Sequence, residues 1–133
     1  MVEEIELNDD FKRTLDLMEN SNKSLLITGR AGTGKSTLLK YFKEHTKKSV
    51  VICAPTGLAA LNVEGQTIHS FFRFPPKIID PHDIKRVYNG IYKLADVIII
   101  DEISMVRADL LDAIDVFMRL NGREPMKPFG GVR

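Results

Sequence analysis

The stretch Gly29-Arg30-Ala31-Gly32-Thr33-Gly34-Lys35-Ser36 has the spacing G-x-x-x-x-G-K-[ST] of a phosphate-binding loop. The apolar run 24–28 before it predicts a buried strand, and residues 37–42 after it predict an amphipathic helix. A loop in that position aims backbone N–H groups and the positive end of a helix at a polyphosphate. A chance glycine-rich turn before a helix is the alternative. We predict a nucleotide site that extends from Gly29 to Thr37.

Within this loop, Lys35 is expected to reach the terminal phosphates as a point charge, and Ser36 to offer its hydroxyl to Mg²⁺. A second apolar run, residues 97–100, ends in Asp101-Glu102. In P-loop enzymes a carboxylate in that place helps to hold the metal, and a following glutamate can activate the attacking water. The two acids could instead cap a helix that begins at residue 103. We predict that Lys35, Asp101 and Glu102 are catalytic and that Ser36 and Asp101 are the metal ligands.

The composition limits the class of protein. The 133 residues are 44% apolar and carry 19 basic and 18 acidic side chains, which predicts one domain with a substantial core and no overall attraction to nucleic acid. The single cysteine, Cys53, excludes an internal disulfide and is expected to be a buried apolar residue rather than a nucleophile. The sequence shows neither a signal peptide nor a run long enough to span a membrane, so we expect a cytoplasmic protein without a membrane partner.

Strands and helices are expected to alternate along the chain. Asn8 can cap a first helix that ends near Asn20, residues 50–53 predict a strand, and residues 58–63 predict a short helix. The last helix should turn an apolar face inward and stop near residues 121–122, the apolar positions being Leu110, Leu111, Ile114, Phe117 and Met118. This order predicts an α/β fold, a parallel sheet with helices on both faces.

A further helix is predicted to begin at Asp80-Pro81, as an N-cap followed by proline at the first helical position. Its apolar stripe would consist of Ile84, Val87, Tyr88, Ile91 and Leu94. Gly90 within that stripe lowers the helix propensity by about 1 kcal/mol relative to alanine.

Two stretches between the nucleotide motifs narrow the class. Residues 54–63, Ala-Pro-Thr-Gly-Leu-Ala-Ala-Leu-Asn-Val, and residues 65–72, Gly-Gln-Thr-Ile-His-Ser-Phe-Phe, resemble signature stretches of the superfamily-one helicases of the Pif-one-like and RecD-like group. The P-loop, the run Asp-Glu-Ile-Ser-Met-Val and the closing residues 128–132 are similar to that group as well. The resemblance covers nearly the whole chain. It implies a RecA-like P-loop fold and an ATP-hydrolysing motor of a 5′-to-3′ DNA helicase.

The resemblance also implies a path for single-stranded DNA over the residues that follow two of the strands. Pro55, Thr56 and Gly57 would line this path, with Thr56 bonding a phosphate. His69, Ser70 and Phe71 would continue it, and an exposed aromatic ring could stack on a base. The alternative for His69 is that it serves only to hold the loop in place, and the alternative for Phe71 is that it belongs to the core.

The chain departs from this group in two respects. Phe11 stands where family members usually have a glutamine that reads adenine, so the preference for adenine is left open. The chain also reaches Arg133 without the family's phosphate-sensing glutamine, its second motor domain or its arginine finger, so the residues 1–133 alone should not unwind DNA. The family's strand after Gly130-Gly131 would lie between the runs 24–28 and 97–100.

Two other functions stay open. One is a kinase for a nucleotide or another small molecule, which would need an arginine-rich lid that the residues after 102 do not offer. The other is a nucleotide-binding module without catalysis, against which the intact Lys35, Asp101 and Glu102 argue. The oligomeric state and the process served, whether repair, recombination or replication, are left open too.

Overall fold

The computed structural model describes residues 8–29 and 34–133, and the chain divides into two compact units, residues 1–47 and 48–133. The first unit contains the P-loop sequence, and the second contains all strands of the described chain. Among the helices that are described, none combines the length and the hydropathy needed to cross a bilayer.

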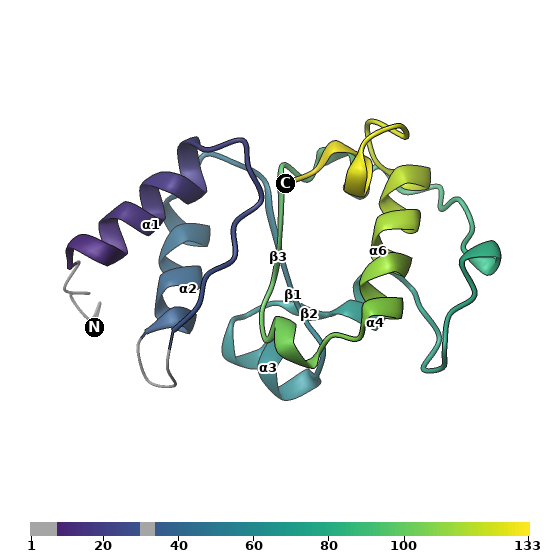
Figure 1. The fold of residues 1–133 in the computed structure, drawn as a ribbon, viewed down its shortest axis with the longest axis horizontal. Helices are drawn as coiled ribbons and strands as arrows, with labels where there is room; N and C mark the ends of the chain where they lie inside the picture. The colour runs from purple at the N-terminus through teal and green to yellow at the C-terminus, as the bar shows by residue number, and fades with distance from the viewer. Residues whose placement is uncertain (1–7, 30–33) are drawn as a thin grey trace. The chain divides into compact units, whose positions relative to one another are not determined.

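In the first unit, helices α1 (Asp9–Asn20) and α2 (Lys35–His45) lie side by side (Figure 1). The carboxamide oxygen of Asn8 accepts a hydrogen bond from the backbone N–H of Phe11 at 2.8 Å, so the predicted cap of the first helix is confirmed. The ring of Phe11 meets that of Tyr41 edge-on, with 6.2 Å between the centroids. Phe11 therefore packs between the two helices, and this role does not depend on whether Phe11 also contacts a nucleotide base.

The strand predicted over residues 24–28 is absent from the described structure. These residues form no ladder, and Leu26 is 74% exposed. A strand exists only through hydrogen bonds to a neighbour, and no described segment pairs with residues 24–28. The prediction was wrong because the apolar run was judged alone, without a partner strand.

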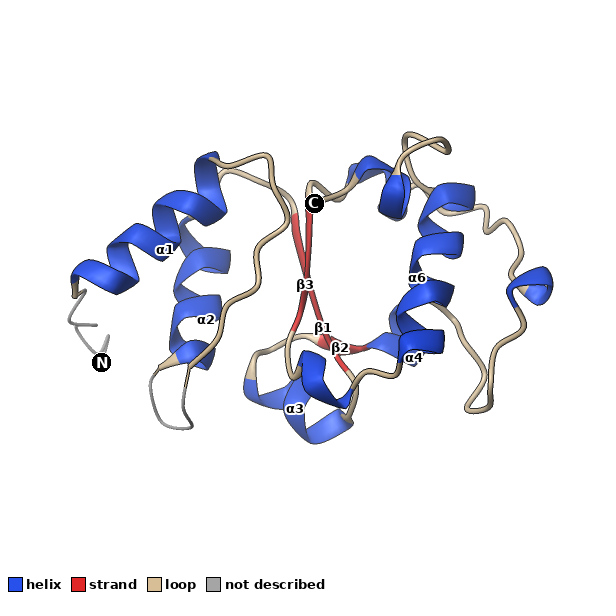
Figure 2. Cartoon of the chain, in the orientation of Figure 1, coloured by secondary structure: helices blue, strands red, loops and turns tan. Residues whose placement is uncertain are grey.

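The second unit is built on a parallel sheet of three strands in the order β2–β1–β3 (Figure 2). Strand β1 (Val50–Ala54) pairs with β3 (Val97–Ile100) from Val50↔Val97 to Cys53↔Ile100, and with β2 (Gln66–Thr67) at Ala54↔Thr67. Parallel strands need crossover connections, and the helices between them supply these. The predicted α/β fold and the strands at 50–53 and 97–100 are confirmed.

The other edge of β3 is occupied at its start. The N–H of Ile98 donates to the carbonyl of Arg133 at 2.8 Å, and the N–H of Arg133 donates to the carbonyl of Asp96 at 3.3 Å. Residues that follow Gly131 therefore begin to pair with β3, at the edge away from β1.

Helix α6 (Ala108–Asn121) covers one face of this sheet (Figure 1). Its inner side chains join an aromatic cluster whose buried members are Cys53, Ile68, Phe71, Phe72, Phe74, Tyr92, Ala113, Ile114, Phe117 and Met118. Successive residues of a strand alternate between faces, so Val51 and Cys53 of β1 both face this cluster. Cys53 is fully buried, and burial raises its pKa to about 12, as expected for an apolar role and not for a nucleophile. Leu110 and Leu111, predicted to face inward, are half-buried at the margin of the cluster.

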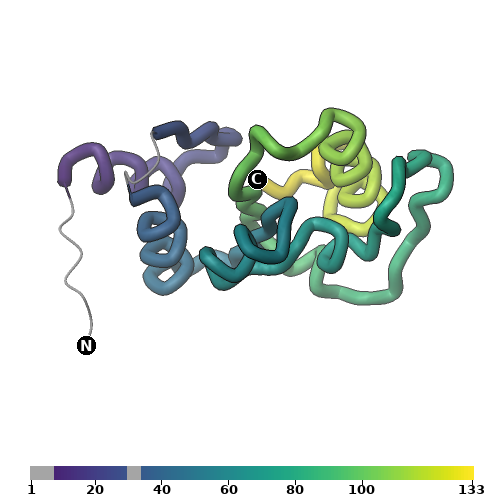
Figure 3. The backbone as a smooth tube through the Cα atoms, turned by 90° about the horizontal axis from the view of Figure 1, so that it is seen from below, coloured from purple at the N-terminus to yellow at the C-terminus, as the bar shows by residue number. Residues whose placement is uncertain are grey.

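The helix predicted from Pro81 onward is much shorter than expected. Asp80 does cap the turn η1 (Pro81–Asp83), but Ile84 is extended, and helical structure resumes only in α5 (Ile91–Leu94). Figures 1 and 3 both show the chain between α4 and α5 as an irregular segment beside α6. The cause is Asn121 of α6, whose carboxamide accepts from the N–H of Val87 at 2.7 Å and donates to the carbonyl of Lys85 at 3.3 Å. Asn121 thus replaces the hydrogen bonds that a helix would have made.

Short elements complete the second unit. Helix α3 (Gly57–Asn62) follows β1, α4 (Ile68–Phe71) follows β2, and the turns η2 (Ile103–Met105) and η3 (Pro128–Gly131) lie before and after α6. Gly130 is left-handed (φ 66°), and a Cβ atom there would lie 2.1 Å from the carbonyl oxygen of Met118, so only glycine fits.

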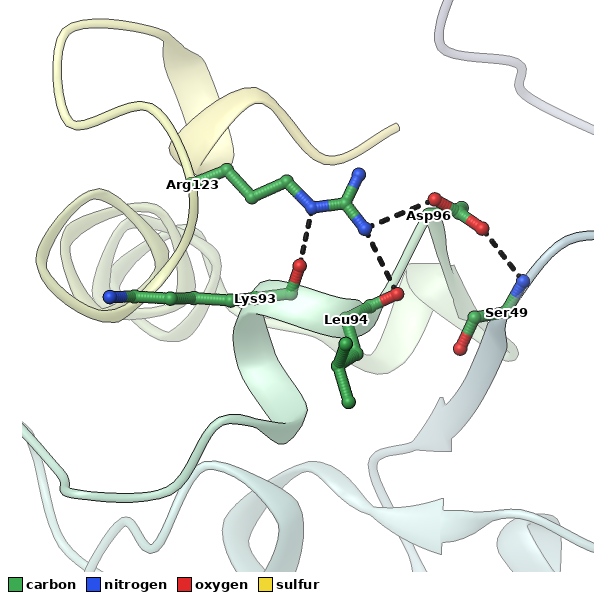
Figure 4. A network of polar contacts seen from close by, with 5 residues as sticks. All are labelled: Ser49, Lys93, Leu94, Asp96 and Arg123. Carbon is green, nitrogen blue, oxygen red and sulfur yellow. Dashed lines mark hydrogen bonds and ion pairs between the residues drawn. The ribbon is translucent and has the colours of Figure 1, made fainter.

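Arg123 fastens the chain after α6 to the start of β3 (Figure 4). Its guanidinium donates to the carbonyls of Lys93 and Leu94, at the end of α5, and to the carboxylate of Asp96 at 3.1 Å. The same carboxylate accepts from the N–H of Ser49 at 2.8 Å, immediately before β1. Arg123 and Asp96 together therefore join three segments at the amino-terminal edge of the sheet.

Candidate nucleotide and nucleic-acid sites

The phosphate-binding loop is partly described. Arg30, Ala31, Gly32 and Thr33 lie outside the described residues, so the predictions for them stay predictions. Gly34 has the left-handed conformation φ 86°, ψ 19°, and its carbonyl accepts the first hydrogen bond of α2 from Leu38 at 2.9 Å. A residue with a Cβ atom disfavours this conformation. The sequence requirement for glycine at 34 thus has a local structural reason.

The side chains at the start of α2 leave its amino terminus open to an anion. Lys35 Nζ donates a hydrogen bond to the carbonyl of Gly29 at 2.7 Å, so the ammonium group lies beside the first residue of the loop. Ser36 and Thr37 are exposed, no acidic residue occupies the first turn, and no side chain of the described residues caps the helix. An uncapped helix amino terminus with a lysine beside it favours a bound polyphosphate.

The two predicted acids follow β3 directly. The N–H of Asp101 donates to the carbonyl of Cys53 at 2.9 Å, which prolongs the pairing with β1 and fixes the place of the carboxylate. Glu102 is left-handed (φ 54°, ψ 46°) and exposed. It precedes η2, yet its side chain makes no capping hydrogen bond. The interpretation of these acids as mere helix caps therefore loses its support.

A metal site can be tested only in part. The described residues contain no group of three or more histidine, cysteine or acidic side chains that could hold an ion. Mg²⁺ needs few protein ligands, prefers oxygen and keeps several waters. The exposed hydroxyl of Ser36 and the carboxylate of Asp101, which forms no ion pair within the described chain, fit that donor type. Because Ser36 and Asp101 belong to different units, their joint role stays a prediction.

Within the second unit, the carboxyl ends of three strands come together. The register Ala54↔Thr67 brings the residues after β1 beside those after β2, and Cys53↔Ile100 brings Asp101 to the same edge. Neighbouring strands are about 4.8 Å apart, so these loops form one continuous surface. Ligands of open α/β sheets bind at this edge. The register thus brings three predicted residues, Thr56, His69 and Asp101, to one edge of the sheet.

Two threonines shape the predicted DNA path. Thr56 Oγ1 accepts from the N–H of Ala59 at 3.2 Å and caps α3, and Thr67 Oγ1 accepts from the N–H of Ser70 at 3.1 Å and caps α4. As an acceptor in its cap, the Thr56 hydroxyl keeps its own hydrogen for a phosphate. The exposed or half-buried remainder of the predicted path consists of Pro55, Gly57, His69 and Ser70.

Phe71 does not fit the base-stacking role predicted for it. The residue is 5% exposed, and its ring packs edge-on against those of Phe72 and Tyr92 at centroid distances of 4.9 and 5.1 Å. The hydroxyl of Tyr92 also donates to the Phe71 carbonyl at 2.6 Å. Phe71 is a core residue, which was the alternative that the sequence left open.

Sequence reasoning missed Asn121 as a structural residue. A signal was present, since Asn121 falls on the same helix face as the apolar Phe117 and Met118, where a polar side chain needs a partner. It also treated Tyr88 as part of an apolar stripe, although Lys85 and Arg86 stand beside it. Tyr88 proves to be 98% exposed.

Comparison with known proteins extends over almost the whole chain. A family model described as PIF1-like helicase matches residues 6–133. The ATP-dependent DNA helicase PIF1 of Emericella nidulans is 35% identical over 92% of this chain and 18% of its own length. The ATP-dependent DNA helicase Pif1 of Bdellovibrio bacteriovorus is 36% identical over 99% of this chain and 31% of its own length. The chain therefore spans less than a third of either relative.

Solved structures show the same likeness in three dimensions. The Pif1 helicase from Bacteroides in complex with ADP-AlF3 and single-stranded DNA superposes with a TM-score of 0.84 at 37% identity, over 97% of this chain and 31% of that one. The Pif1 helicase from Candida albicans gives a TM-score of 0.80 at 34% identity, over 96% of this chain and 31% of that one.

Proposed function

Because the chain belongs to the PIF1-like helicase family, we propose that it is the nucleotide-binding part of an ATP-driven motor that moves along single-stranded DNA. The observation that carries this proposal is the start of α2, where left-handed Gly34 and the Lys35 ammonium leave an uncapped helix amino terminus for a phosphate chain. A Pif1 helicase from Bacteroides that shares the fold is bound to ADP-AlF3 and single-stranded DNA. The proposed direction is 5′-to-3′, and the proposed setting is DNA repair, recombination or replication.

Each residue of the nucleotide site has a distinct task in this proposal. Lys35 and the backbone N–H groups of the loop neutralise the phosphates, which requires Lys35 to exchange the Gly29 carbonyl for a phosphate oxygen. Ser36 and Asp101 are the residues that would hold Mg²⁺, which when bound polarises the phosphoryl group. Glu102 orients the attacking water and accepts its proton.

The carboxyl edge of the sheet is proposed as the DNA-binding surface. The hydroxyl groups of Thr56 and Ser70 can donate to phosphates, and Gly57 permits a close approach of the strand. The chain has a net charge of only +1, so few phosphates are neutralised and the affinity should be modest.

Nucleotide binding is tested by calorimetry with ATP and ADP in the presence of Mg²⁺. We expect binding by the unmodified protein and its loss in Lys35→Ala, because the phosphates lose their nearest cation. Lys40→Ala, on the same helix, is the matched control and should bind normally. Absence of heat with folded, unmodified protein would refute nucleotide binding.

Catalysis is tested separately, with the substitution Glu102→Gln. The amide keeps the size of the side chain but cannot accept a proton, so binding should persist while hydrolysis falls by about 10²- to 10⁴-fold. Equal hydrolysis by the variant would remove Glu102 from this role. Nucleotide binding without any hydrolysis by the unmodified protein would favour the non-catalytic module instead, and phosphate transfer to a small acceptor would favour a kinase.

DNA binding needs variants that spare the cap of α3. Thr56→Ser keeps both the cap and the hydroxyl donor, whereas Thr56→Asp keeps the cap but repels phosphate. Fluorescence anisotropy with a labelled oligothymidylate should give near-normal binding for the serine variant and weak binding for the aspartate variant. Affinity for single strands should also fall as salt rises. Equal binding by both variants would show that DNA does not pass Thr56.

A further inference from the structure

The irregular segment between η1 and α5 presents one aromatic side chain to solvent. Tyr88 is 98% exposed, and the charged residues Lys85 and Arg86 beside it are exposed too. Tyrosine gains by burying its ring, so a ring held almost fully in water requires an explanation. The neighbours Ile84 and Val87, in contrast, pack against the aromatic core. The segment thus turns apolar side chains inward and leaves one ring outside.

The backbone on both sides of Tyr88 is fixed by hydrogen bonds. Asn121, itself 4% exposed, bonds the carbonyl of Lys85 and the N–H of Val87 and also donates to the Phe117 carbonyl at 3.1 Å. After Tyr88, the N–H of Asn89 donates to the Val87 carbonyl at 3.0 Å, and its side chain accepts from Ile91 at 3.1 Å. The exposed ring therefore projects from an ordered support, so little backbone entropy would be lost when a ligand binds.

The charges around Tyr88 are available to a ligand. No hydrogen bond or ion pair of the Lys85 or Arg86 side chain occurs within the described chain. Residues 73–93 contain five basic and two acidic side chains, although the chain as a whole is nearly neutral with a net charge of +1. This segment therefore has a local excess of positive charge, which favours an anionic ligand.

Tyr88 is an exposed aromatic ring whose backbone is held on both sides, and the cations Lys85 and Arg86 stand within three residues of it. This combination has the chemistry of a base-stacking platform. We propose that residues 85–88 form a second contact for single-stranded nucleic acid, in which Tyr88 stacks on a base and Lys85 and Arg86 contact phosphates. The contact is separate in sequence from residues 55–70 at the carboxyl edge of the sheet. It rests on the proposed function, because it lengthens the path of the same strand.

The deciding measurement is the affinity of the full-length protein for a fluorescein-labelled oligothymidylate. Tyr88→Ala should weaken binding by about tenfold, and Tyr88→Phe should restore it because phenylalanine keeps the stacking face. Met126→Ala is the control, since this side chain is also almost fully exposed, at 91%, and lies elsewhere in the sequence. Lys85→Gln combined with Arg86→Gln should reduce the salt dependence of binding, with a slope lower by about 1 to 2.

A direct contact can be shown by photocrosslinking. An oligonucleotide that carries 5-iododeoxyuridine should attach to the tryptic peptide 87–93, and Tyr88→Ala should abolish that product while thermal melting stays unchanged. Normal affinity of Tyr88→Ala for DNA, or attachment elsewhere only, would overturn the inference and leave the proposed function intact. Failure of the unmodified protein to bind single strands would overturn both. Equal losses for Tyr88→Ala and Tyr88→Phe would exclude stacking.

Discussion

Residues 81–95 and residues 108–121 have similar apolar periodicity, yet only the second segment is a continuous helix. The first follows the capping residue Asp80, whereas the second begins after Arg107, which makes no capping hydrogen bond; both place apolar residues at helical spacing. In α6 these residues meet the sheet, and Ile114, Phe117 and Met118 are buried. In the first segment Leu94 is 66% exposed and Tyr88 almost completely so. Periodicity is therefore necessary for an amphipathic helix but does not decide whether one forms.

The difference lies in the hydrogen bonds of the backbone. A segment gives up its helix when other groups satisfy its N–H and C=O groups equally well. Asn121 does this for the carbonyl of residue 85 and the N–H of residue 87. Arg123, just after the helix, donates hydrogen bonds to the carbonyls of residues 93 and 94. Asn121, the last residue of the continuous helix, thus holds residues 85–87 in a non-helical shape.

The largest effect on stability is expected for a substitution in α6, the segment whose apolar side chains are buried. Phe117→Ala should lower the free energy of unfolding by about 3 to 5 kcal/mol, because the ring packs against those of Phe72, Phe74 and Tyr92 and its loss leaves a cavity. Leu94→Ala, in the other segment, should cost less than about 0.5 kcal/mol. Urea unfolding of both variants provides the measurement. Equal costs would mean that residues 81–95 pack as a helix after all.

Asn121→Ala comes next, with an expected loss of about 1 to 3 kcal/mol, since it leaves the Val87 N–H and the Lys85 carbonyl without their partner. The exposed Asn62 of α3 provides the control substitution. Hydrogen exchange should show the amide of Val87 losing its protection well before the amides of β1. Unchanged protection at Val87 would contradict the role given to Asn121.

A smaller effect is expected at Asp96. The hydrogen bond from the Ser49 N–H, and after it the Arg123 guanidinium, hold the pKa of Asp96 below its usual value. A carboxyl group with a lowered pKa in the folded state stabilises the fold above its unfolded pKa of about 3.9, and this contribution disappears as the pH falls through the folded pKa. The Asp96 side chain is 39% exposed, so solvent screening limits the contribution to well under about 1 kcal/mol. Asp96→Asn should therefore be slightly less stable than the unmodified protein at pH 7, and urea unfolding should show this difference vanish once the pH falls below the folded-state pKa of Asp96.

The smallest effect is expected for Gly90→Ala. Gly90 has helical angles (φ −69°, ψ −7°) at the start of α5, and no atom lies within 4 Å of the place where a Cβ would stand. Alanine fits there, but the preceding residues stay non-helical because Asn121 holds them. We expect no gain in the helical signal of far-ultraviolet circular dichroism. A clear gain would show that low propensity at Gly90 alone interrupts the helix.

The sequence predicted what depends on local chemistry. The Asn8 cap, strands β1 and β3 and the end of α6 each follow from a few adjacent residues. It failed where the outcome depends on a distant partner. No described segment pairs with residues 24–28, Phe71 packs in the core against Phe72 and Tyr92, and the backbone of residues 85 and 87 is held by Asn121. A carboxamide 34 residues away in the sequence leaves no trace in local periodicity.

The left-handed backbone of Glu102 has a consequence for attempts to make this protein more robust. A non-glycine residue in that conformation costs on the order of 1 kcal/mol or more, and glycine would remove the cost. A laboratory selection for heat resistance alone should therefore enrich Glu102→Gly early and deliver a sturdier molecule that has lost its proposed proton acceptor. Selection that also demands turnover should keep the glutamate and find its stabilising changes elsewhere.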